Sequence, residues 1–128
     1  MSGERLLVID DESSLREFLT IFLGRHGFEV RTASSGEAGL DVFDAWRPDI
    51  VLTDLNMPGI DGMEVLRQVK ARAAEAGRDV PVVLITAFGS ISRAVEAMRD
   101  GAFDYVAKPF INDELRLTVA KSISITRE

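Results

Sequence analysis

Five polar residues of this 128-residue chain stand at or just beyond the ends of short apolar runs. Asp10 and Asp11 follow RLLVI, Asp54 follows IVLT, Thr86 follows VVLI, and Lys108 comes shortly after FDYV. Three carboxylates brought together would repel one another, and an unpaired buried charge is costly. A hard divalent cation removes that repulsion, and Mg²⁺ binds carboxylates together with waters and phosphate oxygens. If the fold gathers these residues, we expect a site for Mg²⁺ or Mn²⁺.

The same residues have the charges that phosphoryl transfer requires. The Asp54 carboxylate is ionised at neutral pH, so it could attack phosphorus without a general base and form an aspartyl phosphate. The cation and Lys108 would offset charge on the transferred group, and Thr86 would supply a hydroxyl donor. The residue types therefore predict a nucleophilic Asp54 assisted by Lys108 and Thr86.

Taken singly, each residue has a simpler explanation. Asp10 and Asp11 suit an acidic loop that caps a helix, and a lone lysine is most often a surface residue. Only their meeting at one place favours phosphoryl chemistry. The single histidine, His26, lies in GRHG at the end of a predicted helix, where a cation is favourable, so we assign it no chemical role.

Apolar runs that alternate with amphipathic segments must position these residues. We expect strands near 5–9, 28–32, 50–53, 81–85 and 103–106. We expect a first helix that begins at 14, three helices over 35–46, 61–76 and 90–100, and a last helix that begins at 112. Ser14 and Glu17 are expected to form a capping box at the first helix. The fold class predicted is α/β, a doubly wound five-stranded parallel sheet flanked by five helices, flavodoxin-like with strand order 2-1-3-4-5. Sites in such sheets form beyond the carboxyl ends of the strands.

Composition and net charge argue against nucleic-acid-binding, disulfide-stabilised and membrane-spanning proteins. Hydrophobic residues make up 46% and charged residues 28%, which suits one soluble domain with one core. The net charge of −6 argues against direct nucleic-acid contact. The absence of cysteine excludes disulfides and thiolate metal sites, and no apolar run approaches the ~20 residues of a membrane span. With no signal peptide recognisable, a cytoplasmic protein is expected.

Four motifs, in this order and spacing, resemble the receiver domain of two-component response regulators. They are VIDDE (8–12), DIVLTDLNMPGIDG (49–62), VVLITAFGS (82–90) and GAFDYVAKPF (101–110). Because they cover the chain nearly end to end, we expect one receiver domain over 1–128 and no output domain in this chain. The segment 86–110 is most similar to receivers of NtrC-like transcriptional activators. The chain could be a natural single-domain regulator, the receiver of another architecture, or a receiver excised from a longer protein. The resemblance favours the last, a longer parent protein with fused AAA+ and DNA-binding output domains.

The resemblance also implies a ligand set for the metal. Asp54 matches the phospho-accepting aspartate. Asp11, Asp54 and the backbone carbonyl of Asn56 would bind Mg²⁺ directly, and Asp10 would hold a metal-bound water.

It further implies which residues contact and sense the phosphoryl group. Thr86, Lys108 and the amide of Ala87 would contact its oxygens. Tyr105 matches an aromatic residue that turns inward when Thr86 moves toward the phosphate. The Lys108–Pro109 peptide bond matches one that is cis in the family, a conformation common only before proline.

Two positions beside the phosphate and one inside a helix are variable. The resemblance implies that Asn56 and Phe88 flank the phosphate and tune its hydrolysis. We hypothesise that Phe88 shields the acyl phosphate from water, so that Phe88→Ala would dephosphorylate faster. Gly39 stands where the family usually has alanine, and it should cost about 1 kcal/mol of helix stability unless close packing requires it.

As partners, the resemblance implies a sensor histidine kinase as phosphodonor and self-association, or contact with an output domain, on phosphorylation. The responsive face would comprise the helix 90–100, the strand 103–106 and the last helix. Ala94, Ala97 and Ala102 could allow close packing there, or be ordinary helix formers.

Two other classes remain open. A hydrolase acting on external phosphate esters usually has a second acidic residue two positions after the nucleophile, where this chain has Asn56. A binding module that is never phosphorylated usually lacks an acidic or lysine position, and none is missing here. Dinucleotide binding is disfavoured because no G-x-G-x-x-G follows the first strand.

Overall fold

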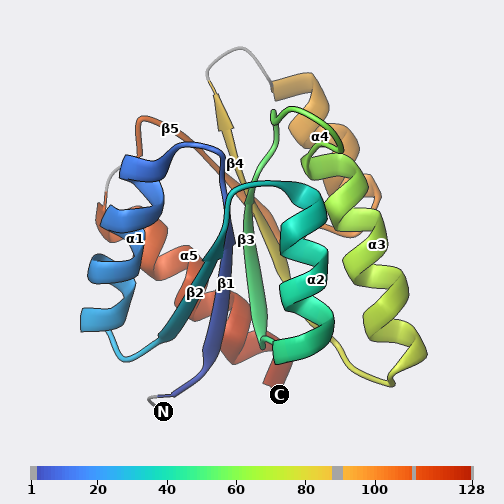
Figure 1. The fold of residues 1–128 in the computed structure, drawn as a ribbon, viewed down its shortest axis with the longest axis horizontal. Helices are drawn as coiled ribbons and strands as arrows, with labels where there is room; N and C mark the ends of the chain where they lie inside the picture. The colour runs from blue at the N-terminus through green and yellow to red at the C-terminus, as the bar shows by residue number, and fades with distance from the viewer. Residues whose placement is uncertain (1–2, 88–90, 111, 128) are drawn as a thin grey trace.

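A computed structural model describes residues 3–87, 91–110 and 112–127. Five strands alternate with five helices (Figure 1). In chain order they are β1 Arg5–Ile9, α1 Ser13–Arg25, β2 Glu29–Ala33, α2 Gly36–Trp46, β3 Ile50–Asp54, α3 Gly62–Glu75, β4 Val82–Ala87, α4 Ile91–Arg99, β5 Asp104–Lys108 and α5 Asn112–Arg127. The expected alternation is confirmed.

The strands form one parallel sheet in the order β2-β1-β3-β4-β5, as predicted. Helices α1 and α5 cover one face, and α2, α3 and α4 cover the other (Figure 1). Because every crossover returns the chain to the same edge, the carboxyl ends of all five strands lie together. That edge is where the candidate chemistry must be sought.

The core has two halves, one on each face of the sheet. Alternate residues of a strand point to opposite faces, so on β1 Leu6 and Val8 pack with α1 and α5, whereas Leu7 and Ile9 pack with α2 and α3. Strand β3 is buried over its whole length, which explains its unbroken apolar run. Two covered faces hold the central strands rigidly, so their carboxyl ends are fixed in position.

The predicted helix starts at Ser35 and Asp61 are confirmed by side-chain caps, and α5 begins at Asn112 as predicted. The Ser35 hydroxyl accepts a hydrogen bond from the Ala38 amide at 3.1 Å, and an Asp61 carboxylate oxygen accepts one from the Glu64 amide at 3.1 Å. The Ser14–Glu17 capping box is wrong. Helix α1 begins at Ser13, so Ser14 lies inside the first turn, and the N-cap residue makes no side-chain capping bond.

The glycine in α2 is explained by close packing. A Cβ built on Gly39 would lie 2.3 Å from Cδ1 of Ile9 on β1. The helix therefore lies against the strand with no room for a methyl group, and the cost in helix propensity is offset by contact with the sheet.

The alanines suggested for an exposed face are instead part of the fold's interior. Ala94 and Ala97 are fully buried and Ala102 is 7% exposed. The small size of Ala94 and Ala97 lets α4 lie close to the sheet, while Val95 and Met98 of the same helix are exposed. The packing hypothesis for those three alanines is therefore wrong.

The Lys108–Pro109 peptide bond is cis, as the resemblance implied. No helix within the described residues is both long enough and apolar enough to cross a membrane.

Candidate functional site

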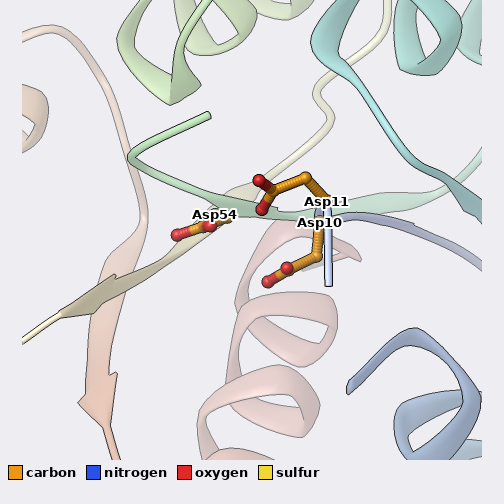
Figure 2. Close-up of side chains that lie close together, drawn as sticks. All are labelled: Asp10, Asp11 and Asp54. Atoms are coloured by element: carbon orange, nitrogen blue, oxygen red, sulfur yellow. The ribbon is translucent and has the colours of Figure 1, made fainter. Parts of the chain in front are cut away.

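The sheet register places three aspartates side by side. Ile9 stands opposite Thr53, so Asp10, the next residue after β1, comes beside Asp54 at the end of β3. Asp11 follows in the same loop. One carboxylate oxygen from each aspartate lies within 4.8 Å of the others (Figure 2). The juxtaposition predicted from the strand ends is present.

The cluster has more negative than positive charge, and two of its three carboxylates are buried. Asp10 is fully buried and Asp54 is 6% exposed, whereas Asp11 faces solvent. Lys108 Nζ lies 3.4 Å from Asp10 Oδ2 and 3.7 Å from Asp54 Oδ2. Three carboxylates and one ammonium leave a formal charge of −2. An all-oxygen donor set with that charge fits a hard divalent cation such as Mg²⁺.

The pKa of Asp54 reflects its burial and this excess of negative charge. Burial raises the pKa of Asp54 above its usual range, and repulsion from Asp10 raises it further. The Lys108 ammonium and the Asn56 backbone N–H, which donates to this carboxylate, lower the pKa but do not compensate. A cation at the cluster would favour the ionised, nucleophilic form of Asp54.

The loop after Asp54 is held tightly against β3. A Cβ on Gly62 would lie 2.4 Å from the Asp54 carbonyl oxygen, so only glycine allows α3 to start this close. Gly59 has φ +77° and lies beside Glu37 of α2, whose Oε2 accepts a hydrogen bond from the Ile60 amide at 3.3 Å. The loop that carries Asn56 is therefore braced by neighbouring elements at more than one point.

Sequence reasoning missed Arg93, which joins α4 to this loop. Arg93 Nη1 donates to Asn56 Oδ1 at 2.6 Å, and its Nη2 donates to Asp61 Oδ2 at 2.5 Å. The burial of Asp61 would raise its pKa, but hydrogen bonds from the Glu64 amide and from Arg93 outweigh burial and lower it. An arginine on an amphipathic helix has no signature in sequence that distinguishes it from a solvated one.

The other predicted residues lie at or near the same edge. Thr86 is fully buried on β4, with its hydroxyl donating to the Ala87 carbonyl oxygen at 3.2 Å. Ala87 is exposed and stands opposite Lys108 in the register. Tyr105 is half-buried against the core cluster and stands opposite Leu84. Thr86 and Tyr105 thus occupy neighbouring strands, as a coupled pair would require.

The sequence analysis singled out two further residues, Phe88 and His26. The hypothesis about Phe88 falls outside the described residues. His26 lies past the far end of α1, where its ring packs edge-on against Phe22 at 5.0 Å. It is remote from the acidic cluster, in keeping with a structural role.

Comparison with known proteins decides the family. The model for the response regulator receiver domain matches residues 6–120. The chain belongs to that family. A receiver is a phosphorylation switch rather than an enzyme that turns over external substrates, and the chain is accordingly a component of two-component signalling.

Relatives of this receiver include activators of the NtrC family, as the motifs implied. Regulatory protein AtoC of Escherichia coli (strain K12) is 40% identical over 121 residues, covering 94% of this chain and 25% of that protein. DNA-binding transcriptional regulator NtrC of Klebsiella pneumoniae is 39% identical over 121 residues, with the same two coverages. A response regulator receiver domain protein from Clostridium thermocellum has a TM-score of 0.90 and 34% identity, covering 97% of both chains.

The lengths of the relatives differ. The receiver spans between about a quarter and a half of the first curated relatives it matches. It spans 98% of sporulation initiation phosphotransferase F of Bacillus subtilis (strain 168), at 33% identity over 125 residues and 98% of this chain. Receivers similar to this one therefore occur both alone and within longer proteins.

Proposed function

We propose that Asp54 accepts a phosphoryl group from a sensor histidine kinase in a reaction that depends on Mg²⁺ or Mn²⁺. The observation that carries the proposal is the acidic cluster of Asp10, Asp11 and Asp54, with Lys108 Nζ within 3.4–3.7 Å of two of its carboxylates. A nucleophilic carboxylate, a fixed ammonium and a residual charge of −2 are the parts that phosphoryl acceptance needs. As a kinase partner implies, we place the reaction in the cytoplasm.

The residues around Asp54 would have two roles, binding the cation and contacting the phosphoryl group. Asp11, Asp54 and the Asn56 carbonyl would hold the cation, and Asp10 would hold one of its waters. When bound, the cation supplies positive charge to the phosphoryl oxygens. An Asp54 carboxylate oxygen forms the new O–P bond while the P–N bond to the kinase imidazole breaks, and the imidazole keeps that electron pair. Lys108 offsets charge on the transferred group, which Thr86 and the Ala87 amide would also contact.

The switch that follows would act through Thr86 and Tyr105. A phosphoryl group that binds the Thr86 hydroxyl would compete with its present bond to the Ala87 carbonyl. Movement of Thr86 would free space for Tyr105 on the adjacent strand and shift the face made by α4, β5 and α5. Both conformations must already exist, with phosphate changing their populations. The exposed Val95 and Met98 of α4 suit self-association through this face.

The domain organisation is part of the proposal. We propose that residues 1–128 form one receiver domain that contacts no nucleic acid itself. AAA+ and DNA-binding output domains in a longer parent protein remain a prediction, supported by the similarity to AtoC and NtrC and their greater length. In that setting the receiver would regulate transcription. The influence of Asn56 and Phe88 on phosphate lifetime also remains a prediction.

One experiment tests the function directly. The protein is incubated with Mg²⁺ and a small phosphodonor, and its intact mass and its size in solution are measured. We expect a gain of one phosphoryl group that is lost in Asp54→Asn and without Mg²⁺, together with a shift toward dimer. The matched control is Asp41→Asn, which removes one charge from an exposed helical position and should gain mass normally. No mass gain in the native protein would favour an unphosphorylated module, and continuous phosphate release would favour a hydrolase.

A further inference from the structure

Helix α4 contacts the loop after Asp54 through the side chain of Arg93. Arg93 lies in the first turns of α4, and the loop runs from Leu55 to Asp61 between the nucleophile and α3. The two terminal guanidinium nitrogens of Arg93, Nη1 and Nη2, donate to Asn56 Oδ1 and Asp61 Oδ2 respectively. A single rigid group therefore spans both ends of the loop. Arginine suits such a span because its planar fork holds two acceptors at a defined separation.

The residue held at one end of the span is itself bonded to the nucleophile. The Asn56 backbone N–H donates to the Asp54 carboxylate, and under the proposed function the Asn56 carbonyl is a metal ligand. Its side chain is held by Arg93. Arginine has only donors, so it also determines that Oδ1 is the amide atom facing α4. A contact made by α4 is thus transmitted through Asn56 to the atoms around Asp54.

The other end of the span is fixed by the fold. Asp61 caps α3, and the Gly62 amide donates to the Leu55 carbonyl at 2.8 Å. Gly62 packs directly on the Asp54 backbone. Asp61 therefore cannot move without disturbing the start of α3, and it serves as the anchor from which Arg93 holds Asn56.

We propose that Arg93 is a positioning residue for the metal site, acting through Asn56. By holding the Asn56 side chain against Asp61, it keeps the Asn56 carbonyl and amide in place for the cation and for Asp54. The proposal deepens the proposed function. It also links α4, part of the proposed output face, to metal binding, so that a partner displacing α4 would weaken metal affinity to the same extent that metal opposes the displacement.

The test measures Mg²⁺ affinity directly, by calorimetric titration of the unphosphorylated protein. Residues that orient metal ligands typically alter metal affinity 10- to 100-fold, and for a contact that is about one-third exposed we expect an increase in the dissociation constant of roughly 3- to 10-fold in Arg93→Ala. Asn56→Ala keeps the backbone carbonyl but removes the acceptor for Arg93, so it should have a similar effect. The double variant should be no worse than either single variant, because both remove the same contact.

The matched control is another arginine that joins α3 to α4. Arg67 Nη2 lies 3.1 Å from Asp100 Oδ2 and 3.7 Å from Glu96 Oε2, and among the described residues its ion pairs do not involve the loop from Leu55 to Asp61. Arg67→Ala should bind Mg²⁺ as the native protein does. An equal loss in Arg67→Ala would show that general docking of α4 is responsible, which would overturn the specific role of Arg93.

Two other results would also overturn it. Unchanged Mg²⁺ affinity in Arg93→Ala is one, and multiplication of the two single effects in the double variant is the other. The rate of Asp54-dependent mass gain is measured in parallel on the same proteins. A native protein that binds Mg²⁺ in an Arg93-dependent way but gains no mass would contradict the proposed function alone. A native protein that binds no Mg²⁺ would contradict both.

Discussion

Replacing Asp54 by asparagine should stabilise the protein when no divalent cation is present. The amide keeps nearly the same shape but removes a buried charge whose surroundings disfavour ionisation. The pKa of Asp54 is raised by burial and by Asp10. A carboxyl with a raised pKa in the folded state binds its proton more tightly there than in the unfolded chain. Its contribution to stability therefore falls as pH rises through and above the usual carboxyl range, and at neutral pH its ionisation destabilises the fold.

The magnitude follows from the distances. The closest oxygens of Asp10 and Asp54 lie within 4.8 Å, which at an effective dielectric constant near 20 corresponds to a repulsion of at least about 3.5 kcal/mol. The attraction between Lys108 Nζ and Asp54 Oδ2 at 3.7 Å is about 4 kcal/mol on the same scale. These terms nearly cancel, so the desolvation of Asp54 decides the sign. We expect Asp54→Asn to be more stable by about 1 to 3 kcal/mol in chelator.

Urea unfolding followed by circular dichroism, with and without Mg²⁺, would measure this effect. Mg²⁺ should raise the native protein's stability by preferential binding to the folded state, and it should do so far less in Asp54→Asn. Asp41→Asn controls for the change in net charge and should behave like the native protein. Lower stability of Asp54→Asn in chelator, or equal Mg²⁺ stabilisation of both proteins, would refute the electrostatic reasoning.

Three further predictions concern the surroundings of the site. Gly62→Ala should lower the free energy of unfolding by about 1 to 3 kcal/mol in urea denaturation, because its Cβ would meet the Asp54 backbone, whereas Gly24→Ala, which meets nothing within 4 Å, should leave it unchanged or slightly raised. Gly39→Ala should destabilise through contact with Ile9, and adding Ile9→Val, which removes the nearest methyl group, should recover much of the loss in thermal unfolding. Asp61→Ala should lower the free energy of unfolding by about 1 kcal/mol at neutral pH through loss of the helix cap. Because folding lowers the pKa of Asp61, this difference should shrink as pH falls through the carboxyl range. Unfolding curves at several pH values would measure it.

The fold was predictable because each element's signal is local. Strand β3 is buried throughout, and its run of apolar residues announces this without knowledge of its neighbours. Ser35 and Asp61 cap helices within three residues of their own position. The capping box at Ser14 failed because the start of α1 is not set by a local signal alone. That start depends on how the loop from Asp10 packs, and a shift of one residue removes the box.

The candidate site was predictable only as a set of residue types. Asp10, Asp11 and Asp54 follow strands, and parallel strands bring their ends to one edge, so their meeting follows from the topology. Arg93 was not predictable. It contacts Asn56 from 37 positions away, and helical periodicity places it no differently from other charged residues of α4.

The amino-acid sequence by itself determined the strands, the helices and the residues whose chemistry meets at the sheet edge, because apolar spacing and chain direction are local properties. The tertiary structure alone decided how the charges balance there. Lys108 lies two strands away from Asp54, and only the register of β3, β4 and β5 brings its ammonium within 3.7 Å of that carboxylate. Likewise, only the packing of α2 on β1 shows that position 39 has no room for a Cβ beside Ile9 and therefore requires glycine. Distances across a sheet depend on every element between them, and no short stretch of sequence contains them.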